Sequence, residues 1–311
     1  AERAQLFASG MGAIAAALLA HLKTGDHILA SHEIYGPAQA LLGHLRDRFG
    51  MSLTYADASD TAAFVGEMRP ETRMVYLESP STLTFNIQDI GAISSAAHAA
   101  GALVLVDNSY ATPLFQQPLA LGADLVVHSA TKYLGGHSDL LAGVVCGSAE
   151  VMKPVGAFGH SLLGAVSGPL DAWLLQRGLR TLPLRLKRHQ ESAAAVAAFL
   201  RAQPKVIRVS YPGSPDHPQR ALIERQMTGA TGLLSFELDA DIDGAARFCD
   251  TLRLFALGWS WGGYESLVVP TGPMAAKARG EERPSGLIRL SIGLEDVGDL
   301  IRDLEAGLAA V

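Results

Sequence analysis

Cysteine and charged residues are scarce in this chain of 311 residues, and each scarcity excludes a class of protein. The two cysteines, Cys146 and Cys249, lie far apart and in no CxxC or metal-binding spacing, so we expect neither a disulfide framework nor a metal site. Charged residues make up 18% of the sequence and form no basic run or arm, which argues against nucleic acid or an anionic membrane as a partner. These absences favour a reducing, cytoplasmic setting.

Long hydrophobic runs are absent too. The run Met11–Ala20 is rich in alanine and shorter than the roughly 20 apolar residues that a membrane span needs. The chain does not open with a signal peptide, and it contains no GK[ST] or GxGxxG phosphate-binding motif. With 49% apolar residues the chain can bury a substantial core, and its length predicts about two globular domains.

What the sequence does contain is an alternation of helical and strand patterns. Three continuous apolar runs, Arg73–Leu77, Leu103–Val106 and Leu125–Val127, are typical of strands buried on both faces of a parallel sheet. Helical patterns lie among these strands, as in Ile90–Ala100 and in the segment that Ser9 can cap. The alternation predicts an α/β fold with a largely parallel, doubly wound sheet.

The pattern changes in the last third of the chain. Asp171–Leu200 is a long helical stretch with a break near Pro183. Further elements follow it, with strands expected at Val206–Val209, Leu233–Leu238 and Ile288–Ile292, and helices at Pro218–Gln226, Gly244–Phe255 and Val297–Ala310. We therefore predict a large domain of residues 1–184 and a smaller α+β domain of residues 185–311. Met274–Ser285 is expected to be a mobile loop.

The first residues predict that a further segment precedes them. The sequence begins with Ala1 and not with methionine, and Ala1–Ala8 resembles the middle of a helical segment. We therefore expect an N-terminal arm that this sequence does not contain.

Polar residues follow three of the predicted strands at the point where each strand ends. They are Glu78 after the first, Asp107 and Asn108 after the second, and the segment His128–Lys132 after the third. In open α/β sheets ligands bind outside the carboxyl ends of the strands, so these side chains are the first candidates for a site.

Lys132 and Asp107 are the two candidates with the most specific chemistry. Taken alone, Lys132 is most simply an exposed lysine, and Asp107 a helix-capping or turn aspartate. At neighbouring strand ends, however, a lysine with a depressed pKa could form a Schiff base with a carbonyl cofactor. A carboxylate against a pyridine nitrogen would keep that nitrogen protonated and make the ring an electron sink.

A third group of residues could bind a phosphate. Gly10 and Met11 belong to an SGMG turn that opens a helix, where free backbone amides and the helix dipole favour an anion, although such a turn is most often only a cap. Ser129 and Thr131 could add two hydroxyl donors. Phosphate, ring nitrogen and aldehyde together describe a single ligand, pyridoxal 5′-phosphate.

The chain resembles the Cys/Met-metabolism family of pyridoxal-phosphate-dependent enzymes. The resemblance is strongest in the segment VDNSYATPLFQQPLALGADLVVHSATKYLGGHSD, residues 106–139. It extends over nearly the whole chain through the motifs SGM at Ser9, IYG at Ile34, LESP at Leu77, RGLRTL at Arg177, LSFEL at Leu234 and RLSIGLED at Arg289. The resemblance implies fold type I, the fold of aspartate aminotransferase.

The resemblance also implies roles for individual residues. Lys132 would be the Schiff-base lysine and proton shuttle, and Tyr35 would stack on the ring and assist proton transfer. Asp107 would bind the ring nitrogen, and the phosphate would be held by Gly10, Met11, Ser129 and Thr131. The substrate would be bound by Ser260, Trp261 and Arg289, with Arg289 gripping the α-carboxylate through its two parallel donors.

Within the family, three features resemble the bacterial cystathionine β-lyases. They are SWGGYESL from Ser260, LESPSTLTFNIQDI from Leu77, and Pro37 after the Tyr-Gly pair. These features favour α,β-elimination of L-cystathionine to homocysteine, pyruvate and ammonia, in methionine biosynthesis and transsulfuration. Two alternatives stay open: a γ-lyase or γ-synthase activity on cystathionine or methionine, and a catalytically silent binding or scaffold protein.

The resemblance further implies a homo-oligomer. Active sites would be shared within a dimer, and dimers would pair into a tetramer. Family members carry a Tyr-x-Arg triplet on a preceding arm that reaches the neighbouring subunit's phosphate site, and this sequence has no such triplet.

Overall fold

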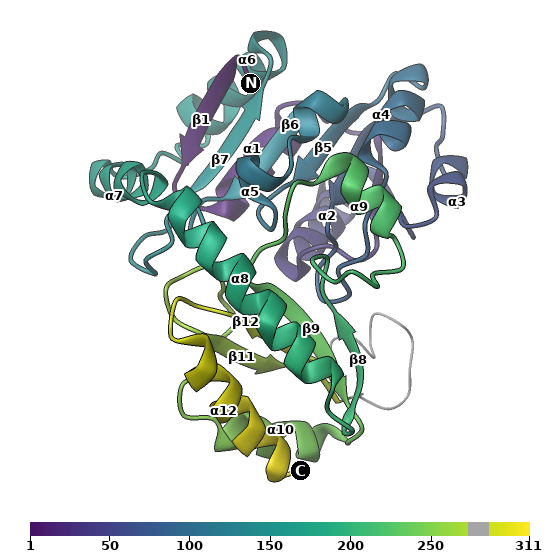
Figure 1. Cartoon of the computed structure of the whole chain (residues 1–311). Helices are drawn as coiled ribbons and strands as arrows, with labels where there is room; N and C mark the ends of the chain where they lie inside the picture. Colours follow the sequence, from purple (N-terminus) through teal and green to yellow (C-terminus); the bar gives the residue numbers. More distant parts are fainter. Residues whose placement is uncertain (273–285) are drawn as a thin grey trace.

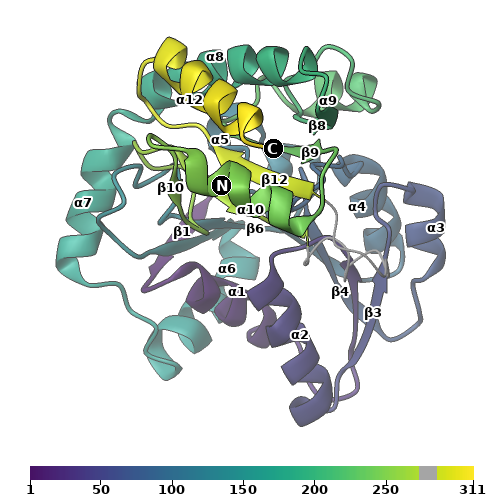
Figure 2. The same ribbon diagram turned by 90° about the horizontal axis from the view of Figure 1, so that it is seen from below.

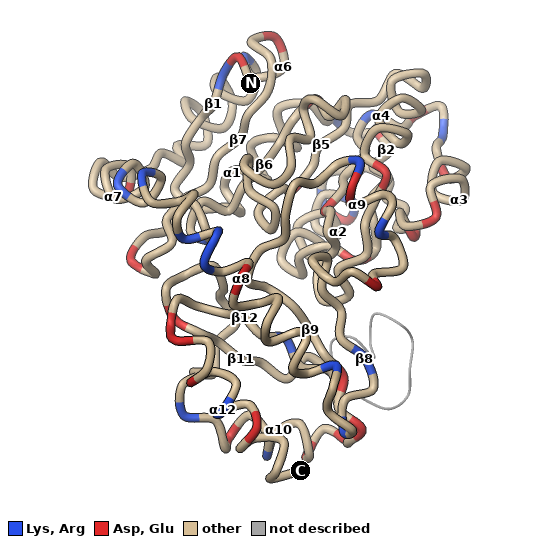
Figure 3. The backbone as a smooth tube through the Cα atoms, viewed as in Figure 1, with Lys and Arg blue, Asp and Glu red and all other residues tan. Residues whose placement is uncertain are grey.

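The computed structural model describes residues 1–272 and 286–311, so the expected loop Met274–Ser285 lies outside the described residues. Within the described ranges, the strands form one sheet of seven and one sheet of five. The larger sheet lies in the upper part of Figure 1 with the N-terminus, and the smaller sheet lies in the lower part with the C-terminus. Basic and acidic residues are interspersed over both parts (Figure 3).

The larger sheet is mostly parallel and has the strand order β1-β7-β6-β5-β4-β2-β3. Neighbouring strands from β3 to β6 are parallel, and β7 is antiparallel to both β6 and β1. The strands are β1 (Arg3–Phe7), β2 (His27–Ser31), β3 (Ser52–Ala56), β4 (Thr72–Glu78), β5 (Leu103–Asp107), β6 (Leu125–Ser129) and β7 (Gly143–Gly147).

Helices cover both faces of this sheet, as expected for strands that are apolar on both sides. One face packs against α1, α2 and α6, and the other packs against α3 and α4. The helical segments of this part are α1 (Gly10–Leu19), α2 (Gly36–Phe49), α3 (Thr61–Gly66), α4 (Ile90–Ala99), α5 (Thr112–Phe115), η1 (Pro118–Leu121), α6 (Ala149–Val155), the π-helical segment η2 (Gly156–Leu162) and α7 (Pro169–Leu179).

The smaller sheet has the order β10-β11-β12-β9-β8 and is covered by helices on one face. In Figure 2 the helices α8 and α12 lie together over this part of the molecule. The elements are α8 (Leu182–Arg201), β8 (Val206–Ser210), α9 (Arg220–Gln226), β9 (Leu233–Leu238), α10 (Ile242–Thr251), β10 (Ala256–Leu257), β11 (Leu267–Pro270), β12 (Gly286–Ser291) and α12 (Val297–Ala309).

The apolar spacing of these helices explains which face they bury. In α12, Leu300, Leu304 and Leu308 recur every four residues and are buried against the core of the smaller sheet, as are Ala245 and Phe248 of α10. Side chains alternate between the faces of a strand, so the opposite face of β9 and β12 is left to the rest of the molecule. That face forms one wall of the candidate site.

The expectation of a helical segment at Ala1–Ala8 is wrong. Residues Arg3–Phe7 form the edge strand β1, which pairs with Gly143–Gly147 of β7 in antiparallel register. Ala, Gln and Leu favour a helix in isolation, but pairing with β7 supplies the backbone hydrogen bonds and overrides this local preference. The expectation of an α/β fold with a largely parallel sheet is confirmed.

The domain boundary at residue 184 stays a prediction. Leu184 lies in the first turn of α8, which leaves the larger part and runs along the smaller sheet (Figure 1). The break expected near Pro183 corresponds to the end of α7 at Leu179 and the start of α8 at Leu182. Among the described helices, none combines the length and the apolar content needed to cross a bilayer.

Candidate active site

A cavity of about 380 Å³ lies at the carboxyl ends of β4, β5 and β6. The smaller sheet closes its other side with the face that the helices leave free. Six of the predicted site residues line it: Tyr35, Asp107, Ser129, Lys132, Trp261 and Arg289. The chain therefore brings together residues separated by more than 250 positions in the sequence.

Lys132 lies in the turn that follows β6 and directs its amine towards the smaller sheet. Its Nζ donates a hydrogen bond to Ser260 Oγ at 3.0 Å and lies 5.5 Å from the centroid of the Trp261 ring. Burial, with a smaller contribution from the positive charge of Arg289, lowers the pKa of Lys132 from 10.5 to about 8. At this pKa about one tenth of the amine is neutral and nucleophilic at pH 7, far more than in an exposed lysine.

The turn that carries Lys132 is held by a buried arginine of α8. Arg185 Nη1 donates to the carbonyl oxygen of Tyr133 at 2.8 Å, directly after Lys132. Within the turn, the backbone N–H of Gly136 donates to the carbonyl oxygen of Lys132 at 2.8 Å. Gly136 has φ of 70°, and a Cβ there would lie 1.9 Å from Arg185 Nη1. This position therefore requires glycine.

Asp107, which is buried, and Glu78, which is half-buried, carry a pair of carboxyl groups at the ends of adjacent strands. They are register partners in β5 and β4. Burial raises the pKa of both, and the charge of Asp107 raises the pKa of Glu78 further. Asp107 Oδ1 accepts a hydrogen bond from the backbone N–H of Ser109 at 2.9 Å, which favours its charged form. Of the two, Glu78 is therefore the better holder of a proton.

Tyr35 lies at the mouth of the cavity, where α2 begins. Its backbone N–H donates to Glu78 Oε2 at 2.7 Å, so the start of α2 is tied to the end of β4. Tyr35 is 45% exposed, and the pKa of its phenol is raised, first by partial burial and then by the charges of Asp107 and Glu78. Tyr35 therefore carries its proton near neutral pH.

The start of α1 packs against the end of β6. Ser9 caps the helix by accepting the Gly12 N–H at 3.0 Å. A Cβ on Gly10 would lie 3.0 Å from Ser129 Oγ and 3.1 Å from Ser129 Cβ, so the missing side chain permits this approach. The turn leaves N-terminal amides of α1 beside the Ser129 hydroxyl, an arrangement that suits an anion.

Two residues predicted to contact the phosphate have other contacts in the structure. Met11 packs partly against the apolar core under the sheet. The Thr131 hydroxyl donates to the carbonyl oxygen of Ala142 at 3.2 Å and accepts from its N–H at 3.0 Å. The phosphate-binding roles of Gly10, Met11, Ser129 and Thr131 stay predictions.

Arg289 projects from β12 into the cavity and is 7% exposed. Its Nη2 donates to the carbonyl oxygens of Trp259 at 2.7 Å and Ser260 at 3.3 Å. Burial lowers its pKa to about 10, so the guanidinium stays charged at neutral pH. A charged fork in a partly apolar cavity is suited to a carboxylate.

The donors in this cavity fit pyridoxal phosphate. The group needs an amine for its aldehyde, a carboxylate for its ring nitrogen and an anion site for its phosphate. Lys132 and Asp107 line one cavity, and the contact of Gly10 with Ser129 leaves the helix start open to an anion. In the same cavity, Arg289 is suited to bind the carboxylate of an amino acid substrate.

Sequence reasoning missed several residues of this cavity: Ser109, Tyr110, Trp259 and the segment 80–85. Ser109 and Tyr110 directly follow Asp107, so their place at a strand end was a usable signal. Ser109 Oγ accepts the Ser129 N–H at 2.6 Å and links the ends of β5 and β6. Trp259 gave no comparable signal, because its role depends on the distant Arg289.

A second cavity of about 540 Å³ lies between the end of β2 and the edge strand β8. Glu33 and Thr84 line both cavities, while Arg201, Asp216 and His217 line only the second. Among the described residues, none of those predicted for the site lines this second cavity. It therefore gives no reason to move the candidate site.

Comparison with known proteins gives one family. The family model described as Cys/Met metabolism PLP-dependent enzyme matches residues 1–309. The chain is 42% identical to an L-methionine gamma-lyase of Pseudomonas putida, over 99% of this chain and 79% of that protein. It is also 42% identical to a cystathionine gamma-synthase of Mycobacterium bovis, over 98% of this chain and 79% of that protein.

Solved structures agree with these relatives. The crystal structure of cystathionine gamma-lyase from Lactobacillus plantarum, complexed with L-serine, superposes with a TM-score of 0.92 at 36% identity. The match covers 99% of this chain and 82% of that one. The similarity thus extends over both sheets and the cavity between them.

Proposed function

The chain belongs to the Cys/Met metabolism family of pyridoxal-phosphate-dependent enzymes, and from this membership we propose that it cleaves the bond at the γ-carbon of a sulfur-containing L-amino acid. The observation that carries the proposal is the single cavity lined by the amine of Lys132, the carboxylate of Asp107 and the guanidinium of Arg289. The names of the relatives support this γ-type chemistry better than the β-elimination that the sequence motifs favour.

Pyridoxal phosphate, when bound, supplies an aldehyde for the substrate amino group and a ring that withdraws electrons from Cα. In this chain Lys132 Nζ would bind the aldehyde and Asp107 the ring nitrogen. The start of α1 and the Ser129 hydroxyl would bind the phosphate. Glu78, which is the better proton holder of the carboxyl pair, leaves Asp107 charged for this role.

Lys132 is the proton carrier of the proposed reaction. With a pKa of about 8, a fraction of the Lys132 amine is neutral near neutral pH. That neutral Nζ would take the proton from Cα, pass it on to the bound cofactor, and only then take a second proton from Cβ. The Cγ–S bond breaks after that, and the sulfur leaves with the bonding electrons. The Tyr35 phenol lines the same cavity and is still protonated at this pH, so it would donate a proton to the leaving sulfur.

Arg289 positions the substrate for these transfers. The carbonyl oxygens of Trp259 and Ser260 hold one guanidinium nitrogen, and among the described residues no other hydrogen bond occupies the fork that would bind the α-carboxylate. Ser260 Oγ accepts from Lys132 Nζ, so the same short segment orients both the amine and the arginine. Binding the carboxylate at a fixed point directs the Cα proton towards Lys132.

Identification of the keto acid tests the proposal. We expect the full-length holoenzyme to release 2-oxobutyrate from both L-methionine and L-cystathionine, measured by chromatography of the derivatised keto acids. Pyruvate from cystathionine, with no product from methionine, would assign β-elimination instead. No keto acid from either amino acid would favour the catalytically silent alternative.

β-Elimination of cystathionine is the second candidate, and one observation favours it. Trp261, in the segment SWGGYESL that resembles the β-lyases, lines the cavity beside Lys132 at 5.5 Å from its Nζ. A tryptophan at this point reduces the room for a side chain that must bend at Cγ. The keto-acid experiment separates the two candidates directly.

We also infer that the enzyme assembles as a homo-oligomer. Large apolar side chains of η2, α7 and α8 are exposed in the single chain, among them Leu162, Leu170, Trp173 and Leu184. Contiguous apolar surface on a folded chain commonly marks a protein–protein interface. Light scattering of the full-length protein is expected to give a dimer or a tetramer and not a monomer.

A further inference from the structure

The loop between β4 and α4, residues 79–89, forms a large part of the cavity wall. Its residues Pro80, Ser81, Thr82, Leu83, Thr84 and Phe85 all line the cavity. The loop lines the same cavity as Lys132 and Arg289, so its conformation limits which substrates fit. The loop would therefore influence substrate binding without taking part in any proton transfer.

The loop has a conformation that its sequence does not favour. Leu83 has φ of 67° and Phe85 has φ of 57°, a left-handed region that residues with side chains rarely adopt. Such conformations persist only where the surroundings determine them, and they are frequent at functional sites. Contacts from outside the loop must therefore hold it.

The first set of contacts comes from the end of β2. Glu33 Oε2 accepts hydrogen bonds from Ser81 Oγ at 2.9 Å, from Asn86 Nδ2 at 3.2 Å and from Thr84 Oγ1. A single carboxylate oxygen thus draws three side chains of the loop together. The smaller sheet adds one contact, from Ser235 Oγ to the carbonyl oxygen of Leu83 at 2.6 Å.

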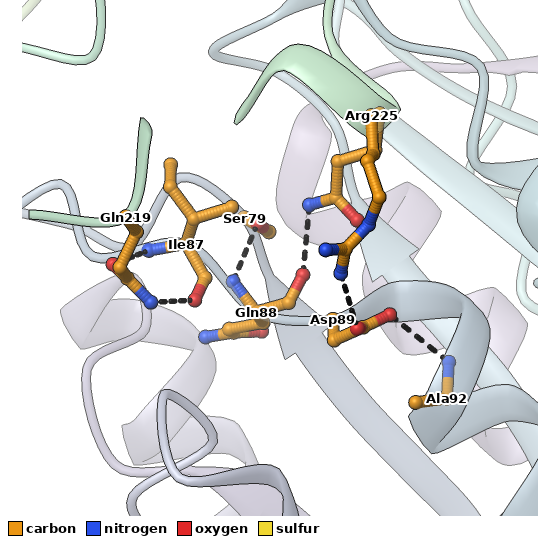
Figure 4. Close-up of polar contacts among 8 residues, drawn as sticks. Ser79, Ile87, Gln88, Asp89, Ala92, Gln219 and Arg225 are labelled. Atoms are coloured by element: carbon orange, nitrogen blue, oxygen red, sulfur yellow. Dashed lines mark hydrogen bonds and ion pairs between the residues drawn. The ribbon is translucent and has the colours of Figure 1, made fainter. Parts of the chain in front are cut away.

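The second set comes from the segment that starts α9, shown in Figure 4. Gln219 bonds both backbone groups of Ile87: its Nε2 donates to the carbonyl oxygen at 2.6 Å, and its Oε1 accepts the N–H at 2.7 Å. The side-chain amide thus makes the same pair of hydrogen bonds that a peptide group of a neighbouring strand would make. Arg225 and Gln226 extend the contact to Asp89 and to the carbonyl oxygen of Gln88, at 2.9 and 2.8 Å.

Apolar contacts connect this attachment to the cavity. Ile87 and Phe85 belong to one buried cluster with Ile223 and Met227 from α9 and the residue after it. The Phe85 ring lies 5.5 Å from the Tyr110 ring, and both rings line the cavity. Movement at Ile87 would therefore be transmitted to Phe85 at the cavity wall.

We propose that Gln219 is a positioning residue that fixes the β4–α4 loop through Ile87 and thereby determines which sulfur amino acids the cavity accepts. The inference rests on the proposed function and names a determinant of its substrate specificity. Gln219 is half-buried, lies far from Lys132 in sequence and lines no part of the cavity itself. Its effect acts through the loop.

The test compares Gln219→Met with Glu224→Gln in the full-length holoenzyme. Methionine keeps the length and approximate volume of the side chain but removes both hydrogen bonds to Ile87. Glu224 is an exposed residue of α9, the helix that Gln219 precedes, and among the described residues its carboxylate bonds to Arg220 alone, so its loss controls for disturbance of α9. Gln219→Glu, which keeps the acceptor for the Ile87 N–H and lacks the donor, is the second variant.

In Gln219→Met we expect amide hydrogen exchange of the loop to be faster by about tenfold, as for loss of one or two hydrogen bonds. The ratio of kcat/KM for L-methionine and L-cystathionine should change by at least about threefold, mainly through KM. Cofactor content and kcat for the better substrate should stay within about twofold of the wild type. For Gln219→Glu, loop exchange and the substrate ratio should both lie between those of the wild type and those of Gln219→Met.

Three results would each overturn the proposal: unchanged exchange of the loop, an unchanged substrate ratio, or the same changes in Glu224→Gln. A general structural defect would lower the fraction of active enzyme for both substrates and leave their ratio intact. If the wild type converts neither amino acid, the proposed function fails separately. Gln219 is then judged by loop exchange and by the dissociation constants of the same two amino acids, measured by cofactor absorbance.

Discussion

Lys132 illustrates how a surface-type residue gains a specific reactivity from its position. Its amine is largely removed from water between two sheets, with Trp261 on one side and the Arg289 charge in the same cavity. Burial, and to a smaller extent the Arg289 charge, favour the neutral amine. The lowered pKa follows from the fold and not from the neighbouring sequence, so it should disappear when the chain unfolds.

This gives a direct prediction for the cofactor-free enzyme. We expect Lys132 to react with an amine-modifying reagent at a rate that is half-maximal near pH 8, the pKa to which burial lowers it. In denaturant the same lysine should show a midpoint near the usual value of about 10.4. Peptide mass spectrometry at several pH values measures both. Equal midpoints in the folded and unfolded chain would contradict the burial argument.

The sequence allowed prediction of those site residues that lie at the ends of recognisable strands. Lys132 and Asp107 follow apolar runs that can only be buried strands, and parallel strands bring their carboxyl ends to one edge. Glu33 and Gln219 could not be predicted in this way. Their partners lie 48 and 132 positions away, and only the folded chain shows which backbone groups need them.

At the scale of elements, the junction of α1 and β6 depends on the absence of one side chain. Gly10→Ala would place a Cβ 3.0 Å from Ser129 Oγ, so the helix start and the strand end must move apart by a few tenths of an ångström. Because both are proposed to hold the phosphate, we expect the dissociation constant of pyridoxal phosphate to rise by about tenfold, equivalent to about 1.4 kcal/mol. Titration of the cofactor-free enzyme measures it.

Gly43→Ala is the matched control for this prediction. Gly43 lies inside α2, and apart from the backbone of its own helix no atom of the described residues lies within 4 Å of a Cβ built there. Alanine in a helix interior is favourable, so this variant should be slightly more stable and bind the cofactor as the wild type does. If both variants bind pyridoxal phosphate equally, the start of α1 does not hold its phosphate.

The elements also show where local sequence preference is insufficient. The buried strands of the larger sheet were predictable, because continuous apolar runs have few other solutions in a chain of this length. β1 was not, since its five residues favour a helix and are strand only through pairing with β7. Edge strands depend on partners more than on their own composition.

At the scale of the whole molecule, α8 connects the two sheets, and His189 lies at the connection. His189 Nδ1 donates to the carbonyl oxygen of Ile292 at 2.7 Å, and the ring packs edge-on against Tyr133, 5.2 Å away. Ile292 directly follows β12, and Tyr133 follows Lys132. Among the described residues, the buried Nε2 atom has no hydrogen-bond partner. Protonation of this atom would therefore bury an unpaired donor.

Burial is the main cause that lowers the pKa of His189 from 6.5 to about 4. Between these values the unfolded chain binds the proton and the folded chain does not, so stability is full above pH 6.5 and is lost as the pH falls towards 4. The loss from this residue is on the order of 3 kcal/mol at pH 4. His128 in β6, whose pKa burial also lowers to about 4, acts in the same direction.

We expect His189→Asn to weaken this dependence on pH. The asparagine amide can still donate to the Ile292 carbonyl but cannot be protonated, so the variant should lose some ring packing at every pH and no proton-linked stability. Its Tm should be lower than that of the wild type at pH 7.5, and the difference should shrink towards pH 4.5, where the wild type is penalised. The test is the Tm of both proteins across this pH range. Parallel curves of Tm against pH would mean that the pKa of His189 is the same in the folded and the unfolded chain. The residual acid loss in the variant should then come from groups such as His128 in β6 of the larger sheet, whose pKa burial lowers in the same way.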